Sequence, residues 1–156
     1  SFTELASYPL LAIAKIMGKN YKDVKFISFV DSNGVDLYTK AYFQYEKGIA
    51  EVKVGLGVKS EGNLVVSGTN GYILAESPWW MTKTFEVCYE DRELNEKVFS
   101  RYLGQGLRYE IGAFISLING SKKYATAVLQ EDSIFFAEII EKYIEQRCTK
   151  EIVEIK

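Results

Sequence analysis

Two runs of alternating residues decide the fold of this chain: residues 35–46 read VDLYTKAYFQYE, and residues 49–58 read IAEVKVGLGV. In the first run, one side carries Leu37, Thr39, Ala41, Phe43 and Tyr45, and the other carries Asp36, Tyr38, Lys40, Tyr42 and Gln44. A period of two residues is typical of a strand with one face in a hydrophobic core. The short connection between the runs predicts that the two strands pair in an antiparallel hairpin.

The same period continues on both sides of this hairpin. We expect further strands at residues 24–31, 63–67, 72–76, 84–90 and 97–103, with tight turns at Asn33-Gly34 and Asn70-Gly71. A period near 3.6 predicts helices at residues 1–18, 107–118 and 131–147. In the last helix, the side chains expected to face inward are Ile134, Phe135, Ile139, Tyr143 and Ile144.

The order of these elements, a helix, a series of strands and two helices, predicts an α+β fold. We expect an open, predominantly antiparallel sheet of about six to seven strands with helices packed on one face. Residues 1–156 are expected to form a single domain. The chain begins with Ser1 rather than Met, so we expect it to be part of a longer protein.

The composition is that of an ordinary globular protein and excludes several classes of function. Of the 156 residues, 47% are apolar and 26% are charged, and the net charge is −2. Because there is no basic excess to neutralise phosphates, nucleic acid is not an expected partner. No run approaches the roughly 18 to 20 apolar residues of a membrane-spanning helix. We therefore expect no membrane partner and a cytoplasmic location.

The absence of histidine narrows the possible chemistry further. Without an imidazole, neither a Ser-His-Asp nor a Cys-His nucleophilic site can form. The two cysteines are too few for a cysteine-based metal site, so we expect no metal.

Two glycine-rich segments resemble nucleotide-binding loops only superficially. Gly55, Gly57 and Gly62 have the wrong spacing and precede a predicted strand. Gly104 and Gly106 precede a predicted helix, but Tyr109 stands where the third glycine of G-x-G-x-x-G belongs. We therefore expect no cofactor-binding residues in this chain.

Aromatic residues gather at two places outside the predicted core. Residues 77–80 read SPWW, and two adjacent tryptophans in a loop cannot easily both enter the core. Trp79 and Trp80 are therefore candidate substrate-binding residues, since aromatic rings stack on sugars and cofactors, with core packing as the alternative. The sheet face that carries Tyr38 and Tyr42 is either a solvated surface or a subunit interface. We expect a homo-oligomer that uses this face.

Three motifs follow one another in a fixed order. Residues 62–73 read GNLVVSGTNGYI, residues 77–80 read SPWW, and residues 104–114 read GQGLRYEIGAF. Their order and spacing resemble the C-terminal domain of the Gfo/Idh/MocA oxidoreductases, which has a Gly-Thr-x-Gly hairpin and a helix that begins near Gly-x-Gly-Leu-Arg-Tyr-Glu. The resemblance extends over roughly residues 3–145.

The resemblance implies a two-domain parent enzyme. Its N-terminal Rossmann domain, absent from this chain, binds NAD or NADP and supplies a lysine from a Glu-Lys-Pro motif. The C-terminal domain covers a small-molecule substrate, typically a sugar, an inositol or a related polyol, and commonly mediates oligomer contacts. The chain would then be the substrate-binding and oligomerisation domain of an NAD(P)-dependent oxidoreductase, and we expect it to be inactive alone.

The same resemblance implies two catalytic residues. Residues 4–8 read ELASY and stand where the family carries Asp-x-Gly-x-His or Asp-x-Gly-x-Tyr. Glu4 thus takes the place of the Asp, Ala6 that of the Gly, and Tyr8 that of the His or Tyr. A tyrosine near the reacting carbon can donate or relay a proton to the substrate oxygen, and Glu4 can orient it or bind a hydroxyl. The alternatives are a free-standing small-ligand-binding protein and a structural dimerisation module.

Overall fold

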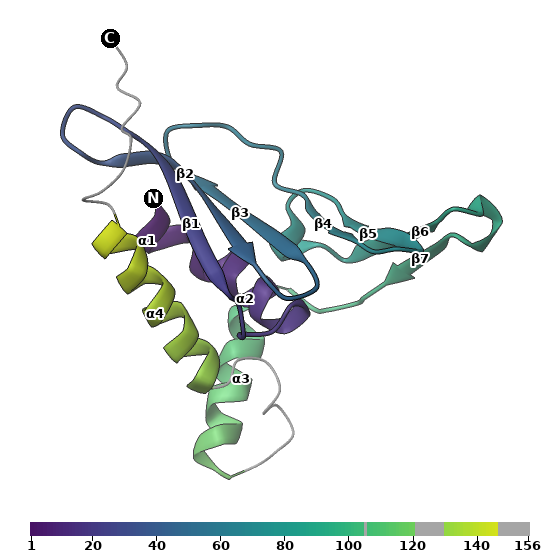
Figure 1. Cartoon of the computed structure of the whole chain (residues 1–156). Coiled ribbons are helices and arrows are strands. Elements are labelled where there is room, and N and C mark those ends of the chain that lie inside the picture. Colours follow the sequence, from purple (N-terminus) through teal and green to yellow (C-terminus); the bar gives the residue numbers. More distant parts are fainter. Residues whose placement is uncertain (105, 121–129, 147–156) are drawn as a thin grey trace. The chain divides into compact units, whose positions relative to one another are not determined.

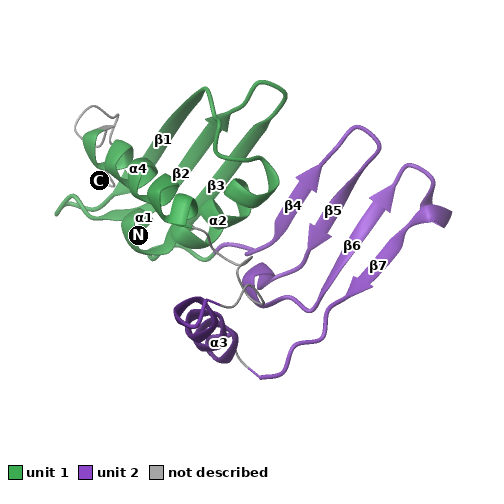
Figure 2. Cartoon of the chain, turned by 90° about the horizontal axis from the view of Figure 1, so that it is seen from below, with its two compact units in different colours: residues 1–59, 124–156 green, residues 60–123 purple. Residues whose placement is uncertain are grey.

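The computed structural model describes residues 1–104, 106–120 and 130–146 (Figure 1). The chain divides into two compact units, Ser1–Lys59 with Tyr124–Lys156, and Ser60–Lys123 (Figure 2). The described elements of the first unit are α1 (Phe2–Leu5), α2 (Ser7–Ile16), β1 (Asp23–Val30), β2 (Asp36–Gln44), β3 (Ile49–Gly55) and α4 (Gln130–Gln146). Those of the second unit are β4 (Leu64–Ser67), β5 (Gly71–Ala75), the 3-10 turn η1 (Trp79–Met81), β6 (Thr84–Tyr89), the 3-10 turn η2 (Arg92–Leu94), β7 (Glu96–Phe99) and α3 (Leu107–Ile118).

The first unit is built on a three-stranded antiparallel sheet in the order β1-β2-β3. The register places Ala41 of β2 opposite both Phe26 of β1 and Val52 of β3, and all three side chains are buried. The predicted hairpin between the two alternating runs is therefore confirmed. Its period of two places the apolar side chains of all three strands on one face.

Helices α1, α2 and α4 cover this apolar face (Figure 1). Three rings from α1, β1 and α4 meet in the core: the Phe2 centroid lies 4.5 Å from that of Tyr143 and 5.3 Å from that of Phe26. Because large aromatic rings bury the most apolar surface per residue, this contact joins the three elements.

Asp36 ties the first helix to the sheet. Its carboxylate accepts hydrogen bonds from the Ser1 amino group at 2.6 Å, the Phe2 N–H at 2.7 Å and the Ser1 hydroxyl at 2.8 Å. In the 156-residue chain, burial disfavours the charged form, but the Ser1 ammonium group and the hydrogen bonds outweigh burial and lower the pKa of Asp36 to about 2. A strand residue thus supplies the acceptor that the first N–H groups of the helix need.

The burial of Asp36 corrects its expected place on the open face beside Tyr38. The pairing of β1 with β2 shifts between Phe29, which lies opposite Tyr38, and Val30, which lies opposite Asp36. One additional residue, Leu37, is therefore accommodated in β2. Such a bulge reverses the side on which the residue before it, Asp36, would otherwise lie, and strict alternation does not anticipate it.

A second buried carboxylate joins α2 to α4. The Asp132 side chain is 1% exposed and accepts hydrogen bonds from Lys15 Nζ at 2.7 Å and Lys19 Nζ at 3.0 Å. The hydrogen bond to Asp132 is the main cause that raises the pKa of Lys19, because it stabilises the charged amine.

The second unit contains a four-stranded antiparallel sheet in the order β4-β5-β6-β7. The predicted Asn70-Gly71 turn lies between β4 and β5. A Cβ at Gly71 would lie 2.2 Å from the backbone oxygen of Cys88, so only glycine permits this close approach of β5 and β6.

The α+β class and the antiparallel pairing are confirmed, but a single sheet of six to seven strands is wrong. The strands form separate ladders of three and four, because β4 bonds β5 and not β3. In the last helix Phe135, Ile139 and Tyr143 are buried as predicted, whereas Ile134 and Ile144 are 52% and 53% exposed. No side chain of α3 is buried, so helices pack on one face of β1–β3 only, as far as the described residues show. None of the described helices is long and apolar enough to cross a membrane.

Asp36→Asn should destabilise the chain in a pH-dependent way. The folded pKa of Asp36 lies below its usual 3.8, so the stabilisation is complete above about pH 4 and is lost as the pH falls toward 2. For the 156-residue chain we expect the free energy of unfolding of the variant at pH 6 to be about 2 kcal/mol lower than that of wild type, measured by urea titration and circular dichroism.

The exposed Glu46→Gln provides the matched control and should change stability by less than about 0.5 kcal/mol. A difference between wild type and Asp36→Asn that stays the same from pH 6 to pH 2 would contradict the role of the carboxylate.

Candidate functional site

Glu4 and Tyr8 lie on one exposed surface of the N-terminal helical segment of the first unit. Helical hydrogen bonds continue through the junction of α1 and α2, where Ala6 N–H donates to the Phe2 carbonyl at 3.0 Å and Leu10 N–H to the Ala6 carbonyl at 2.9 Å. Residues four apart therefore lie on the same side. Glu4 is exposed and Tyr8 is 56% exposed. Both side chains are therefore accessible to a ligand.

Ala6 lies on the opposite side of this segment. It is 0% exposed and belongs to the hydrophobic core. Its methyl group therefore packs inward, away from the exposed Glu4 and Tyr8 side chains.

Aromatic residues line a pocket of about 330 Å³ in the second unit. Its lining residues are Trp80, Met81, Thr82, Tyr102, Gly104, Gly106 and Tyr109, which we call the aromatic pocket. Two of the sequence motifs, SPWW and GQGLRYE, thus contribute to one site. Trp80 is 54% exposed, whereas Trp79 is half-buried and its ring lies edge-on to Trp80 with centroids 6.1 Å apart.

Hydrogen bonds to backbone groups connect the segments that form the aromatic pocket. Trp79 N–H donates to the Gly62 carbonyl at 3.1 Å. The Tyr102 hydroxyl donates to the Met81 carbonyl, and the Tyr109 hydroxyl accepts from Leu103 N–H at 2.6 Å. Sequence reasoning missed Tyr102 and Met81 because a hydrogen bond between residues far apart in the chain brings them together.

Two cations stand close to the rings of the aromatic pocket. Lys83 Nζ lies 5.4 Å from the Tyr102 ring centroid, and the Arg108 guanidinium lies 5.9 Å from that of Tyr109. These distances are within the range of cation–π attraction. Among the described residues, no carboxylate lines this pocket.

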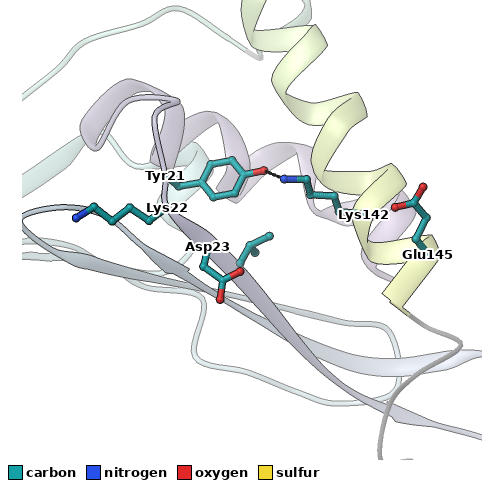
Figure 3. Close-up of a pocket in the computed structure, with 6 residues that line it drawn as sticks. Tyr21, Lys22, Asp23, Lys142 and Glu145 are labelled. Atoms are coloured by element: carbon teal, nitrogen blue, oxygen red, sulfur yellow. Dashed lines mark hydrogen bonds between the residues drawn. The ribbon is translucent and has the colours of Figure 1, made fainter.

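A different pocket of about 260 Å³ lies in the first unit, between the start of β1 and α4 (Figure 3). The Lys142 amino group and the Tyr21 hydroxyl point toward each other and form a 2.7 Å hydrogen bond, which raises the pKa of Lys142. Lys22, Asp23 and Glu145 complete a lining of mixed charge. The opposite charges balance, so this pocket shows no preference for an anion or a cation.

The open face of the first sheet carries Tyr38 and Tyr42 as predicted. Tyr42 is 38% exposed and Tyr38 is half-buried, on the face opposite the buried Thr39 and Ala41. An ion pair between Lys40 and Glu51, 2.8 Å long, crosses this face and raises the pKa of Lys40. Within the described part of the chain, no group of three or more potential metal ligands lies together.

Solved structures share this fold. The chain superposes on UDP-N-acetylglucosamine 3-dehydrogenase GnnA from Acidithiobacillus ferrooxidans with a TM-score of 0.66 and 14% identity, covering 91% of this chain and 44% of that one. The chain also superposes on a mutant of KijD10, a 3-ketoreductase from Actinomadura kijaniata in complex with TDP-benzene and NADP, with a TM-score of 0.72 and 15% identity. This match covers 99% of this chain and 49% of that one. The chain therefore shares the fold of about half of each of these oxidoreductases. The resemblance predicted from the three motifs is confirmed at the level of the fold.

The chain spans about half the length of each of the solved structures it matches. A protein of Yersinia pestis, YPO2259, gives the same result, with a TM-score of 0.67, 14% identity and coverage of 99% of this chain and 50% of that one. No protein-family model and no curated protein matches the sequence.

The exposures of the two tryptophans can be checked by quenching. The chain has two tryptophans, Trp79 and Trp80, so Trp79→Phe leaves only the exposed ring and Trp80→Phe leaves only the half-buried one. We expect acrylamide to quench the fluorescence of Trp79→Phe more strongly. Equal quenching constants in the two variants would contradict the geometry of the aromatic pocket.

Proposed function

We propose that this chain is the C-terminal, substrate-binding domain of an NAD(P)-dependent oxidoreductase that acts on a sugar, an inositol or a related polyol. The observation that carries the proposal is the fold. Nearly the whole chain matches about half of a sugar-nucleotide dehydrogenase and of a 3-ketoreductase. The domain would comprise both compact units, and we propose a cytoplasmic location.

The described residues do not fit a dinucleotide site. Gly55 and Gly57 lead to a strand, and Gly106 precedes α3 without the βαβ unit that such a loop needs. NAD or NADP would supply hydride transfer, and we place its binding in a Rossmann domain of the parent enzyme rather than in this chain.

Tyr8 and Glu4 are the proposed catalytic residues of this chain. The exposed Tyr8 hydroxyl can exchange a proton with a substrate oxygen, since a positioned phenol is a general acid–base group. Glu4, one helical turn away on the same surface, can accept a hydrogen bond from a substrate hydroxyl. Trp79 and Trp80 are the proposed substrate-binding residues, Trp80 by direct contact and Trp79 by supporting its ring.

We further propose that the open face of the first sheet forms a homo-oligomer contact. Exposed Tyr42 and Ile27, together with half-buried Tyr38, give this face a mixed aromatic and aliphatic character that suits an interface.

The coding sequence of the parent gene provides a direct test of the proposal. Sequencing upstream of the Ser1 codon should reveal a Rossmann segment of roughly 120 residues with G-x-G-x-x-G. The 156-residue chain alone should show no NAD(P)-dependent turnover of sugars or nucleotide sugars. A start codon immediately before Ser1 would instead favour a free-standing ligand-binding protein or a structural dimerisation module.

Tyr8→Phe in the parent enzyme should lower kcat by roughly 10²- to 10⁴-fold with little change in KM, because only the proton-transfer group is removed. Tyr89→Phe is the control, since Tyr89 is an exposed residue at the end of β6 outside the proposed sites and its substitution should leave kcat unchanged. Steady-state kinetics with the parent's own substrate measure both. A Tyr8→Phe variant with wild-type kcat would refute the catalytic role.

A further inference from the structure

The aromatic pocket offers ring faces rather than hydrogen-bonding groups. The Thr82 hydroxyl donates to the Thr84 carbonyl at 2.6 Å, and the Tyr102 hydroxyl donates to the Met81 carbonyl. The Tyr109 hydroxyl already accepts from Leu103 N–H. Two of the three lining hydroxyls thus donate their protons to backbone carbonyls, so the pocket offers few donors to the many hydroxyls of a hexose, and unpaired polar groups oppose binding. A planar aromatic ligand can instead bind by stacking on the rings alone.

The charge around the rings favours an anionic ligand. Lys83 and Arg108 lie close to two of the lining rings. One N–H group of Arg108 donates a hydrogen bond to the Leu103 carbonyl at 3.3 Å. A guanidinium has five N–H donors, so further donors remain for a phosphate. Aromatic stacking combined with flanking cations is the combination that binds nucleotides.

We propose that the aromatic pocket binds the nucleobase of a nucleoside diphosphate-activated sugar, with Lys83 and Arg108 placed to contact the diphosphate. This inference rests on the proposed function and narrows its substrate class. The volume of about 330 Å³ is in the range of small-molecule sites. Trp80, the most exposed of the pocket's large rings, would stack on the base.

Calorimetry with the 156-residue chain tests the stacking step. UDP and TDP should bind and also change the fluorescence of Trp79 and Trp80. Trp80→Ala should weaken binding by roughly 5- to 100-fold, the range found for the loss of one stacking ring. Trp80→Phe should restore most of the affinity because it keeps a ring. Tyr89→Ala removes a comparably exposed ring at the far end of β6 and should bind UDP like wild type.

The proposed contact of Lys83 and Arg108 with the diphosphate is tested by comparing the binding of UDP with that of uridine. Lys83→Gln and Arg108→Gln should weaken the binding of UDP but not that of uridine, which lacks the phosphates. The advantage of UDP over uridine should also shrink as the salt concentration rises. Equal losses for both ligands would show that these residues only maintain the pocket, and would overturn their assignment to the diphosphate.

The remaining outcomes separate this inference from the proposed function. Binding of free N-acetylglucosamine but not UDP would overturn the nucleotide assignment and leave a sugar oxidoreductase standing. Binding of NADP without UDP or TDP would assign the pocket to the cofactor and overturn the inference. If none of these ligands binds, the inference fails, whereas the upstream gene sequence still decides the proposed function.

Discussion

The contact between the Asp36 carboxylate and the start of α1 is the constraint on which the first unit depends. Asp36 also accepts a hydrogen bond from Thr39, whose hydroxyl lies 2.9 Å from that of Ser28, and both hydroxyls lie within 3.4 Å of the Tyr143 hydroxyl. This network joins α1, β1, β2 and α4 inside an apolar core. Since every buried polar group needs a partner, the network fixes the position of each element relative to the others within the unit.

The two units reach their structures by different means. The first has a core of interlocking aromatic and aliphatic side chains beneath three helices. In the described part of the second unit, Ala75 and Cys88 are the only buried residues. That unit therefore depends on its strand ladders and on backbone contacts such as the close approach at Gly71. Within this unit, a half-exposed aromatic pocket can remain accessible to a ligand.

The candidate site was predictable where it depends on local geometry. The spacing of Glu4 and Tyr8 placed both on one helical surface, and the structure keeps both exposed. The SPWW loop indicated an exposed ring, which is Trp80. Tyr102 and Met81 were not predictable, because a side-chain bond across the fold brings them to the pocket. The pocket of Tyr21 and Lys142 was missed for the same reason, since residues far apart in the chain form it.

The sequence by itself determined the α+β class and the antiparallel hairpins, because periodicity and turn residues act over short distances. The likeness to the Gfo/Idh/MocA oxidoreductases came instead from the order and spacing of three motifs. Only the tertiary structure decided that the strands form two ladders, that Asp36 turns inward, and that Ile134 and Ile144 face outward. A one-residue bulge reverses a side chain, and the partner of a helix or strand is chosen by packing across the whole unit. Alternation along the chain does not contain that information.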